Sequence, residues 1–257
     1  MTMNMLSDIP FVGNLTVPDL IAVLMLFTAW FGLGWITERP PAGRPSVSVL
    51  MMRYRREWMK HFITRDPRIF DSNILSSLRD GTAFFASACM IAIGGTLALI
   101  GNTDRLRGIV QGLELEQGNT LLWEFKLLVP MFFVVNAFLK FVWSHRLFGY
   151  CAIMMAAVPN EIDHPATRER ASQAAELNIT AARSFNAGLR SVYFALGGLA
   201  WLAGGWALIA ATIVVFYVTW RREFASNSRR VIMRNLPVPQ LPDHARPPKS
   251  APPPPQQ

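Results

Sequence analysis

Two polar residues interrupt an apolar stretch of the chain at helical spacing. Asn136 and Lys140 are four positions apart within the stretch at about 121–143, so a helix would place both side chains on one face. Ionisable residues at membrane depth commonly mark paths for ions or solutes, and this face could line a water-filled path. In the alternative interpretation, Lys140 extends to the membrane interface and Asn136 forms a hydrogen bond with another helix.

A second polar stripe leads into another apolar stretch. Glu176, Arg183 and Arg190 recur every seven residues, with Asn186 beside them, which gives one charged face on a helix. Such a face suits an oligomer contact, an anion-attracting vestibule, packing against a neighbouring helix, or simple exposure to solvent. Arg190 is the strongest candidate for a function because a long uncharged stretch begins at the next residue.

A dense group of charges of both signs, with one tryptophan among them, precedes residue 72. It comprises Arg53, Arg55, Arg56, Glu57, Trp58, Arg65, Asp66, Arg68 and Asp71. Opposite charges at this density favour ion-paired packing between cytoplasmic helices. The alternative is a surface that binds the headgroups of anionic phospholipids, as basic residues beside a membrane commonly do.

Patterns typical of catalytic and metal sites are missing from the sequence. Cys89 and Cys151 both lie in apolar sequence, and there is no Cys-x-x-Cys pair. Of the four histidines only His145 lies near an apolar stretch, which leaves no second imidazole for a haem or a metal. No nucleophile–base pair or phosphate-binding glycine loop occurs in a plausible context. We therefore expect no enzymatic activity, no cofactor and no metal.

The composition indicates a membrane protein. Of the 257 residues, 51% are hydrophobic and 16% are charged, whereas soluble domains have about 25% charged residues. The net charge of +8 comes mostly from basic residues beside apolar stretches, so we expect the bilayer and its anionic lipids as partners. No basic module with interleaved aromatic residues is present, and we expect no nucleic acid partner.

The elements that carry these residues are all expected to be helices. Apolar stretches of about 20 residues each cross a bilayer once, and they predict spans at about 17–36, 82–101, 121–143, 185–203 and 205–221. We expect an amphipathic cytoplasmic helix over 46–64, followed by a helix that runs from about Arg68 into the second span. The expected fold is all-α: a polytopic membrane protein with about five transmembrane helices and cytoplasmic helical extensions.

One helical membrane domain is expected over 17–234. An extracytoplasmic N-terminus at 1–16 precedes it and contains no Lys or Arg, so we expect the first span to remain as an anchor and not to be a cleaved signal. The segment at 235–257 is rich in proline and poor in apolar residues, and we expect a disordered tail there.

The stretch Ser191–Trp220 decides the expected topology. Its thirty uncharged residues are long for one crossing and short for two. A single crossing would leave the basic segment after residue 220 outside the cell, against the tendency of Lys and Arg to stay in the cytoplasm. Two crossings with a turn at Gly204-Gly205 keep that segment inside. The same tendency places the basic loop before residue 69 inside. We therefore expect a bacterial inner-membrane protein with its N-terminus outside and its C-terminus in the cytoplasm.

Several motifs, taken in order, resemble those of one family. They are Tyr54-Arg55-Arg56-Glu57-Trp58-Met59, Arg65-Asp66-Pro67-Arg68-Ile69 with Asp71, Phe84-Phe85-Ala86-Ser87, Gly94-Gly95, Phe125-Lys126-Leu127-Leu128, Phe185-Asn186-Ala187-Gly188-Leu189-Arg190 with Tyr193-Phe194, and Arg221-Arg222-Glu223-Phe224. Over about residues 15–228 the chain is similar to the uncharacterised bacterial membrane family called domain of unknown function 599. It departs from that family at Gly204-Gly205, where relatives carry a Pro-containing turn, and in its Pro-rich tail. The resemblance implies no reaction.

Two classes of function are compatible with these observations. The leading hypothesis is an oligomeric membrane protein that conducts or transports an ion or small solute along Asn136, Lys140 and Arg190. The alternative is a structural or accessory subunit of a larger membrane complex. In that case the polar stripes are docking surfaces, the amphipathic helix anchors the complex, and the proline-rich tail recruits a partner.

Overall fold

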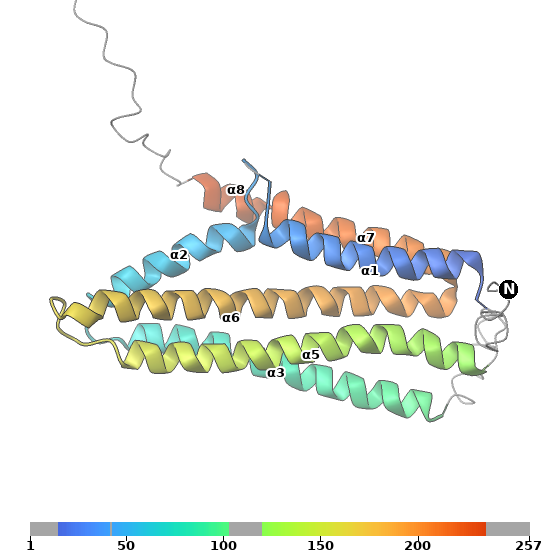
Figure 1. The fold of residues 1–257 in the computed structure, drawn as a ribbon, viewed down its shortest axis with the longest axis horizontal. Coiled ribbons are helices and arrows are strands. Elements are labelled where there is room, and N and C mark those ends of the chain that lie inside the picture. Colours follow the sequence, from blue (N-terminus) through green and yellow to red (C-terminus); the bar gives the residue numbers. More distant parts are fainter. Residues whose placement is uncertain (1–14, 42, 103–119, 235–257) are drawn as a thin grey trace, which may run out of the picture.

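The computed structural model describes residues 15–41, 43–102 and 120–234, and all regular structure within these ranges is helical (Figure 1). The all-α fold class is therefore confirmed. The expected extracytoplasmic segment before residue 15 and the expected disordered tail at 235–257 lie outside the described residues.

Seven α-helices and one 3-10 helix make up the described part of the chain. They are α1 (Val17–Glu38), α2 (Val47–Phe62), α3 (Ile69–Ile100), α5 (Thr120–Ala156), α6 (Pro165–Gly198), the 3-10 helix η2 (Leu199–Ala203), α7 (Gly205–Phe224) and α8 (Asn227–Arg234). The amphipathic helix expected at 46–64 is α2. The helix expected from about Arg68 is α3, which continues without a break through the predicted second span.

Local sequence signals set the helix starts. Ser46 caps α2, because its Oγ accepts a hydrogen bond from the Val49 amide at 3.2 Å. In α1, the carboxylate of Asp19 accepts hydrogen bonds from the amide and the hydroxyl of Thr16, at 3.0 and 2.6 Å. A proline lies in the first turn of both α1 and α6, where its missing amide hydrogen costs no helical hydrogen bond.

The antiparallel pair α5–α6 forms the centre of an elongated bundle (Figure 1). Helix α3 packs on α5, α2 packs on the first half of α6, and the pair α1–α7 covers the second half of α6. We call the end that holds Gly204 and the start of α1 the hairpin end. The opposite end, where α5 is connected to α6, is the loop end.

Three hydrophobic cores follow one another along this pair. At the loop end α2, α3, α5 and α6 bury Met59, Phe62, Leu75, Phe148, Cys151 and Ala174, among others. A smaller core around Cys89, Ala137 and Phe141 lies between α3, α5 and α6. In the other half α1, α5, α6, η2 and α7 bury Leu26, Phe133, Phe194, Trp201 and Leu208, among others. Helices α5 and α6 take part in all three cores and so connect them.

Three of the described helices, α1, α3 and α5, are long and apolar enough to cross a membrane. The apolar part of α3 is only 6% buried, and it exposes Phe84, Met90, Ile91 and Leu97. Exposed apolar surface of this extent fits contact with lipid. The chain is thus consistent with a multi-pass membrane protein.

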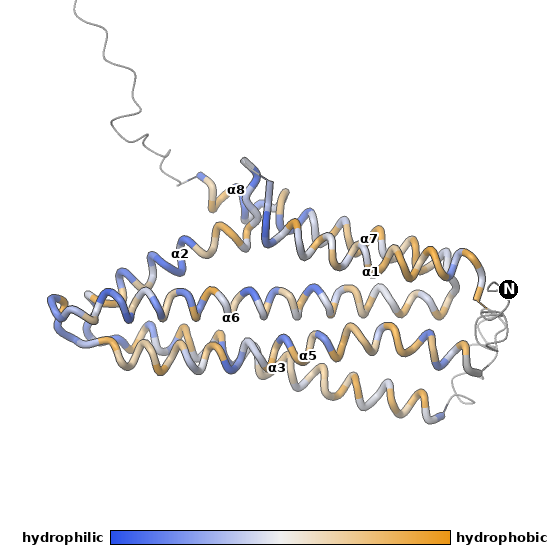
Figure 2. The backbone as a smooth tube through the Cα atoms, in the orientation of Figure 1, coloured by the Kyte–Doolittle hydropathy of each residue, from blue (hydrophilic) through white to orange (hydrophobic). Residues whose placement is uncertain are grey.

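The count of five spans remains a prediction. The first half of α6 is polar, its helix already ends at Gly198, and α7 carries Arg221 and Arg222 in its last turn. These features leave less continuous apolar sequence in α6 and α7 than in the other three candidates. Figure 2 shows the same gradient, with polar residues gathered in α2 and the first part of α6 and apolar residues prevailing in α1 and α7.

The chain reverses direction at Gly204, the position that the sequence indicated for a hairpin. Gly204 has φ = +110°, a backbone conformation that favours glycine. At Gly205 a Cβ atom would lie 2.9 Å from the backbone of Pro18 and Asp19. The two glycines therefore have separate tasks: the first turns the chain, and the second lets the start of α7 approach the start of α1.

Packing between α5 and α6 should depend on Gly188. A Cβ atom there would lie 2.7 Å from the ring of Phe141, which is fully buried and stacked against Phe85 at 5.3 Å. We expect Gly188→Ala to destabilise the protein by about 1–3 kcal/mol through overpacking. Thermal unfolding in mild detergent measures this loss.

The matched control is Gly94→Ala in α3, where nothing lies within 4 Å of the added Cβ. That variant should unfold at the same temperature as the wild type or slightly above it. Equal destabilisation by both substitutions would contradict the described packing of α5 on α6.

Candidate functional site

An ion pair between a buried arginine and a half-exposed glutamate links the end of α1 to the second half of α6. The Arg190 Nη2 atom lies 3.0 Å from Glu38 Oε1, and the side chains of Arg190 and Glu38 are 10% and 49% exposed. The guanidinium packs against Gly34, where an added Cβ would lie 3.7 Å away in ordinary van der Waals contact. A charge buried to this degree is costly without a partner, so Glu38 stabilises the position of Arg190.

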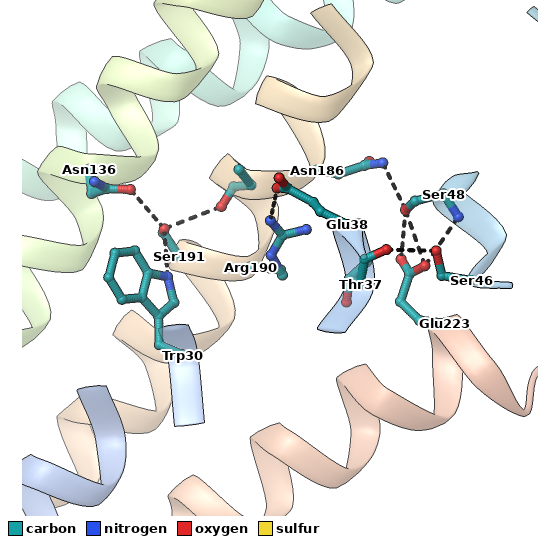
Figure 3. Close-up of polar contacts among 11 residues, drawn as sticks. Trp30, Thr37, Glu38, Ser46, Ser48, Asn136, Asn186, Arg190, Ser191 and Glu223 are labelled. Atoms are coloured by element: carbon teal, nitrogen blue, oxygen red, sulfur yellow. Dashed lines mark hydrogen bonds and ion pairs between the residues drawn. The ribbon is translucent and has the colours of Figure 1, made fainter. Parts of the chain in front are cut away.

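On one side of this pair lies a cavity of about 230 Å³ between α1, α2, α6 and α7, which we call the inner cavity. Its polar lining consists of Thr37, Glu38, Ser48, Arg55, Arg183, Asn186, Arg190 and Glu223. Ser48 is the centre of its hydrogen bonds (Figure 3). The Ser48 hydroxyl accepts from Asn186 Nδ2 at 3.2 Å, and Glu223 accepts from the Ser48 amide and hydroxyl at 3.2 and 3.1 Å.

Two further contacts complete the wall of the inner cavity. Arg183 Nη2 lies 3.2 Å from the sulfur of Met52, and the Ser46 hydroxyl donates to the Thr37 carbonyl at 2.8 Å, which ties α2 to the end of α1. The Thr37 side-chain hydroxyl is buried and has no hydrogen-bond partner among the described residues. A buried polar group in this state marks a place where a water or ligand can bind.

On the other side of the ion pair lies a cavity of about 460 Å³ between α1, α5 and α6, which we call the lateral cavity. It is lined by Trp30, Phe31, Gly34, Trp35, Glu38, Arg39, Asn136, Lys140, Ala187 and Arg190. Ser191 bridges its deep wall, because its hydroxyl accepts from Trp30 Nε1 at 3.2 Å and lies 3.1 Å from Asn136 Oδ1 (Figure 3). Glu38 and Arg190 thus belong to both cavities.

The first set of predicted site residues is gathered around this ion pair. Asn136, Lys140 and Arg190 line the lateral cavity, and Arg183, Asn186 and Arg190 line the inner cavity. The predicted common face of Asn136 and Lys140 is confirmed. Asn136 also makes the inter-helix hydrogen bond of the alternative interpretation, to Ser191 of α6. The structure shows where these residues lie. That they form a path for an ion or solute stays a prediction.

The expected stripe on α6 is divided between two environments. Glu176 turns away from the cavities and pairs with Arg56 of α2 at 2.6 Å, with both side chains about half exposed. This hydrogen bond lowers the pKa of Glu176 below its ordinary value. An exposed pair of this kind contributes at most about 1 kcal/mol, so Glu176 is part of the loop-end packing.

The mixed-charge group mostly pairs within the chain. Arg65 and Trp58 Nε1 both donate to the buried Asp71, and Arg68 donates to the carbonyls of Val158 and Pro159 at 2.9 and 3.0 Å. Arg55 donates to Asn178, and Glu57 lies 3.8 Å from His61. Arg53, Glu57 and Asp66 are exposed. Arg65 and Asp71 thus form an ion pair, as Arg56 does with Glu176, whereas Arg55 and Arg68 bind uncharged groups of α6 and of the segment after α5.

An aromatic cluster separates both cavities from the hairpin end. The ring of Phe133 lies 5.1 Å from Phe27, 5.4 Å from Trp30 and 6.3 Å from Phe194. All four residues belong to the apolar core of this half. The polar residues that line the two cavities do not continue through this aromatic layer.

A second set of buried charges lies beyond the aromatic layer. Asp19 is 1% exposed and accepts a hydrogen bond from Trp201 Nε1 at 2.7 Å. Lys126 is also 1% exposed, and its Nζ atom lies 5.4 Å from the centre of the Trp123 ring. Asp19, Lys126 and Trp201 lie on α1, α5 and η2 at the hairpin end, and none of them lines either cavity.

Sequence reasoning missed the acidic partners. Each lies at the end of an apolar helix: Glu38, Glu223 and Asp19. A single carboxylate in such a place is typical of an ordinary helix boundary. The sequence feature that could have identified them is that each carboxylate lies beside an uncharged stretch. Such a stretch is long enough to be buried on one side. Among the described residues, no three His, Cys, Asp or Glu side chains lie close enough to hold a metal ion.

The ion pair should contribute to stability as a unit. We expect Glu38→Gln to cost about 1–3 kcal/mol, since it leaves the Arg190 charge buried without its partner. The double variant with Arg190→Gln should lose at least about 1 kcal/mol less than the sum of the single variants. Unfolding of the four proteins in mild detergent measures the coupling, and additive losses would contradict a direct interaction.

Comparison with known proteins gives one result. No curated protein and no solved structure matches the chain. A family model described as "Protein of unknown function, DUF599" matches residues 21–228, a range that contains both cavities, the ion pair and the hairpin. The chain therefore belongs to the DUF599 family of proteins of unknown function, as its motifs indicated.

Proposed function

We propose that this chain is an oligomeric multi-pass protein of the bacterial inner membrane that transports a small anion. The observation that carries the proposal is the position of the Glu38–Arg190 pair between two polar cavities, next to helices that are apolar enough to cross a membrane. A buried arginine with a carboxylate partner in such a place is typical of solute pathways.

The sign of the lining favours an anion. Three arginines, Arg55, Arg183 and Arg190, face two carboxylates, Glu38 and Glu223, around the inner cavity. Cavities with an excess of one charge raise the local concentration of the opposite ion. The unpartnered Thr37 hydroxyl adds a hydrogen-bond donor to the same wall.

The orientation follows from charge. The loop end carries the basic residues of α2 and of the α2–α3 connection, and α7 and α8 end in further arginines. Lys and Arg beside spans favour the cytoplasm. In this orientation the inner cavity opens toward the cytoplasm and the aromatic cluster closes the outer side, so transport requires that this layer move.

The structural or accessory role is favoured by a different observation. The polar groups of Ser48, Asn186 and Glu223 already satisfy one another within the chain, and the apolar face of α3 is almost fully exposed. A protein built to dock in a membrane complex has the same features. Stoichiometric co-purification with another membrane protein would support this second role.

Flux through liposomes tests the transport proposal. Vesicles that contain the full chain should release chloride or nitrate faster than empty vesicles. Arg190→Gln should lower the rate at least about tenfold, because 1.4 kcal/mol of lost attraction for the anion corresponds to that factor. Lys60→Gln, which removes an exposed charge outside both cavities, is the control. Release no faster than from empty vesicles, for several anions and cations, would contradict transport.

Reporter fusions test the topology separately. A phosphatase that is active only outside the cytoplasm should be inactive when fused after Arg234, and a fluorescent protein that folds only in the cytoplasm should be bright there. A phosphatase inserted in the loop between α3 and α5 should be active. An active phosphatase after Arg234 would mean that Ser191–Trp220 does not cross twice.

A further inference from the structure

We infer that the lateral cavity is a binding site for the phosphate-bearing headgroup of an anionic phospholipid, held by Arg39 and Lys140. The inference names a ligand for the lateral cavity, and it stands whether or not the inner cavity carries a solute. Three observations lead to it: the charges that the cavity leaves without partners, its depth along α1, and the apolar side chains around its mouth.

The first observation is an excess of positive charge. Arg39, Lys140 and Arg190 border the cavity together with a single carboxylate, Glu38. Glu38 is paired with Arg190. Lys140 is exposed and has no hydrogen-bond or ionic partner among the described residues. Two cations are thus left for an anion from outside the chain.

Arg39 is held in a position that suits such a ligand. Its guanidinium lies 4.2 Å above the centre of the Trp35 ring, a cation–π contact that fixes the side chain at the end of α1. No hydrogen bond from the Arg39 guanidinium to another described residue accompanies this contact, so its N–H groups can donate to a ligand. Planar N–H donors of this type match phosphate oxygens, whereas Lys140 contributes a compact charge.

The second observation is the depth of the cavity. No charged residue occurs in α1 between Leu20 and Thr37, and Glu38 and Arg39 follow. Trp35 lies within one turn of these charges and lines the cavity, and tryptophan prefers the boundary between hydrocarbon and headgroups. The cavity therefore lies where the headgroups of one leaflet end, and Lys140 reaches the same level from α5.

The third observation is the mouth of the cavity. Helices α1 and α5 touch through Phe27 and Phe133, yet they leave the cavity between Trp35 and Lys140, with Ala187 and Arg190 as its floor. At the mouth Phe31 is 67% and Trp35 is 54% exposed. Apolar side chains exposed beside cations suit a molecule that is charged at one end and apolar at the other.

These features favour a lipid over a free phosphate ion. A free ion would use Arg39 and Lys140 and would leave the aromatic walls in water. A phospholipid places its phosphate between the two cations and its acyl chains along the exposed face of α1, which continues through Phe31 and Leu24. A volume of about 460 Å³ is within the range of roughly 300–1,000 Å³ typical of ligand sites.

Lipid retention by the full chain tests the inference. The protein is placed in nanodiscs of phosphatidylcholine with a small share of phosphatidylglycerol, released into mild detergent, and examined by native mass spectrometry. We expect wild-type protein to retain phosphatidylglycerol in preference to phosphatidylcholine. The double variant Arg39→Gln with Lys140→Gln should lower that preference roughly 25-fold, at about fivefold for each basic residue near a membrane surface.

Matched controls separate the site from general charge. Lys60→Gln with Arg168→Gln removes the same two charges from exposed positions outside the lateral cavity and should keep the preference. The single variant Lys140→Arg retains Arg39 and the positive charge at position 140, so it should also keep the preference. Unchanged unfolding temperatures show that the variants are folded. A preference that persists in the double variant, or one that the control double variant loses equally, overturns the inference.

A competition arm distinguishes the two sources of phosphate. A large excess of inorganic phosphate should leave the bound phosphatidylglycerol in place, because the ion cannot replace the contacts of the acyl chains. Displacement of the lipid by inorganic phosphate would instead assign the cavity to a free anion. The lipid assay and the flux assay can fail independently. A lipid preference without transport would contradict only the transport proposal, and transport without a lipid preference would contradict only this inference.

Discussion

The close antiparallel contact between α5 and α6 is the constraint on which the rest of this structure depends. Phe141 faces Gly188, the Ser144 hydroxyl donates to the Ala181 carbonyl at 2.7 Å, and Cys151 lies 3.4 Å from the Ala174 carbonyl. These three contacts follow α5 forward and α6 backward, so they fix the register of the two longest helices over most of their shared length. Every other long helix packs on one member of this pair.

A group of polar side chains gathers where the helices leave the apolar half of the bundle. At the end of α1 the chain leaves the apolar half and turns into α2, and there the Glu38–Arg190 pair, Ser48 and Glu223 come together from four helices. A purely apolar contact at this level would leave the helix ends without partners. The same groups that join the helices also create the two cavities, so structural and functional roles cannot be assigned to separate residues here.

Sequence reasoning was effective where one physical rule dominates. Hydrophobic periodicity predicted α2 and the continuous α3, and the glycine pair predicted the reversal at Gly204, because a turn between apolar segments favours a residue that adopts positive φ. Spacing also predicted that Asn136 and Lys140 share a face. These predictions concern one helix at a time, and local rules suffice for them.

The partners across helices could not be predicted in the same way. Which arginines Glu176 and Glu38 pair with depends on the angles at which α2 and α1 cross α6, and no pattern in the sequence fixes those angles. For the same reason Asp71 and Asp19 were not recognised as buried carboxylates. Each is buried by a residue that lies on another element, Trp58 for Asp71 and Trp201 for Asp19.

The bond between Asp19 and Trp201 also has a consequence for the order of assembly. The two residues are separated by 182 positions, and at about 5–20 residues per second a ribosome needs roughly ten to forty seconds to make the intervening chain. During that time Asp19 has Thr16 as its local hydrogen-bond donor and lacks the indole that buries it. Helix α1 can therefore reach its final place only after η2 has been made, so this contact forms late among those described.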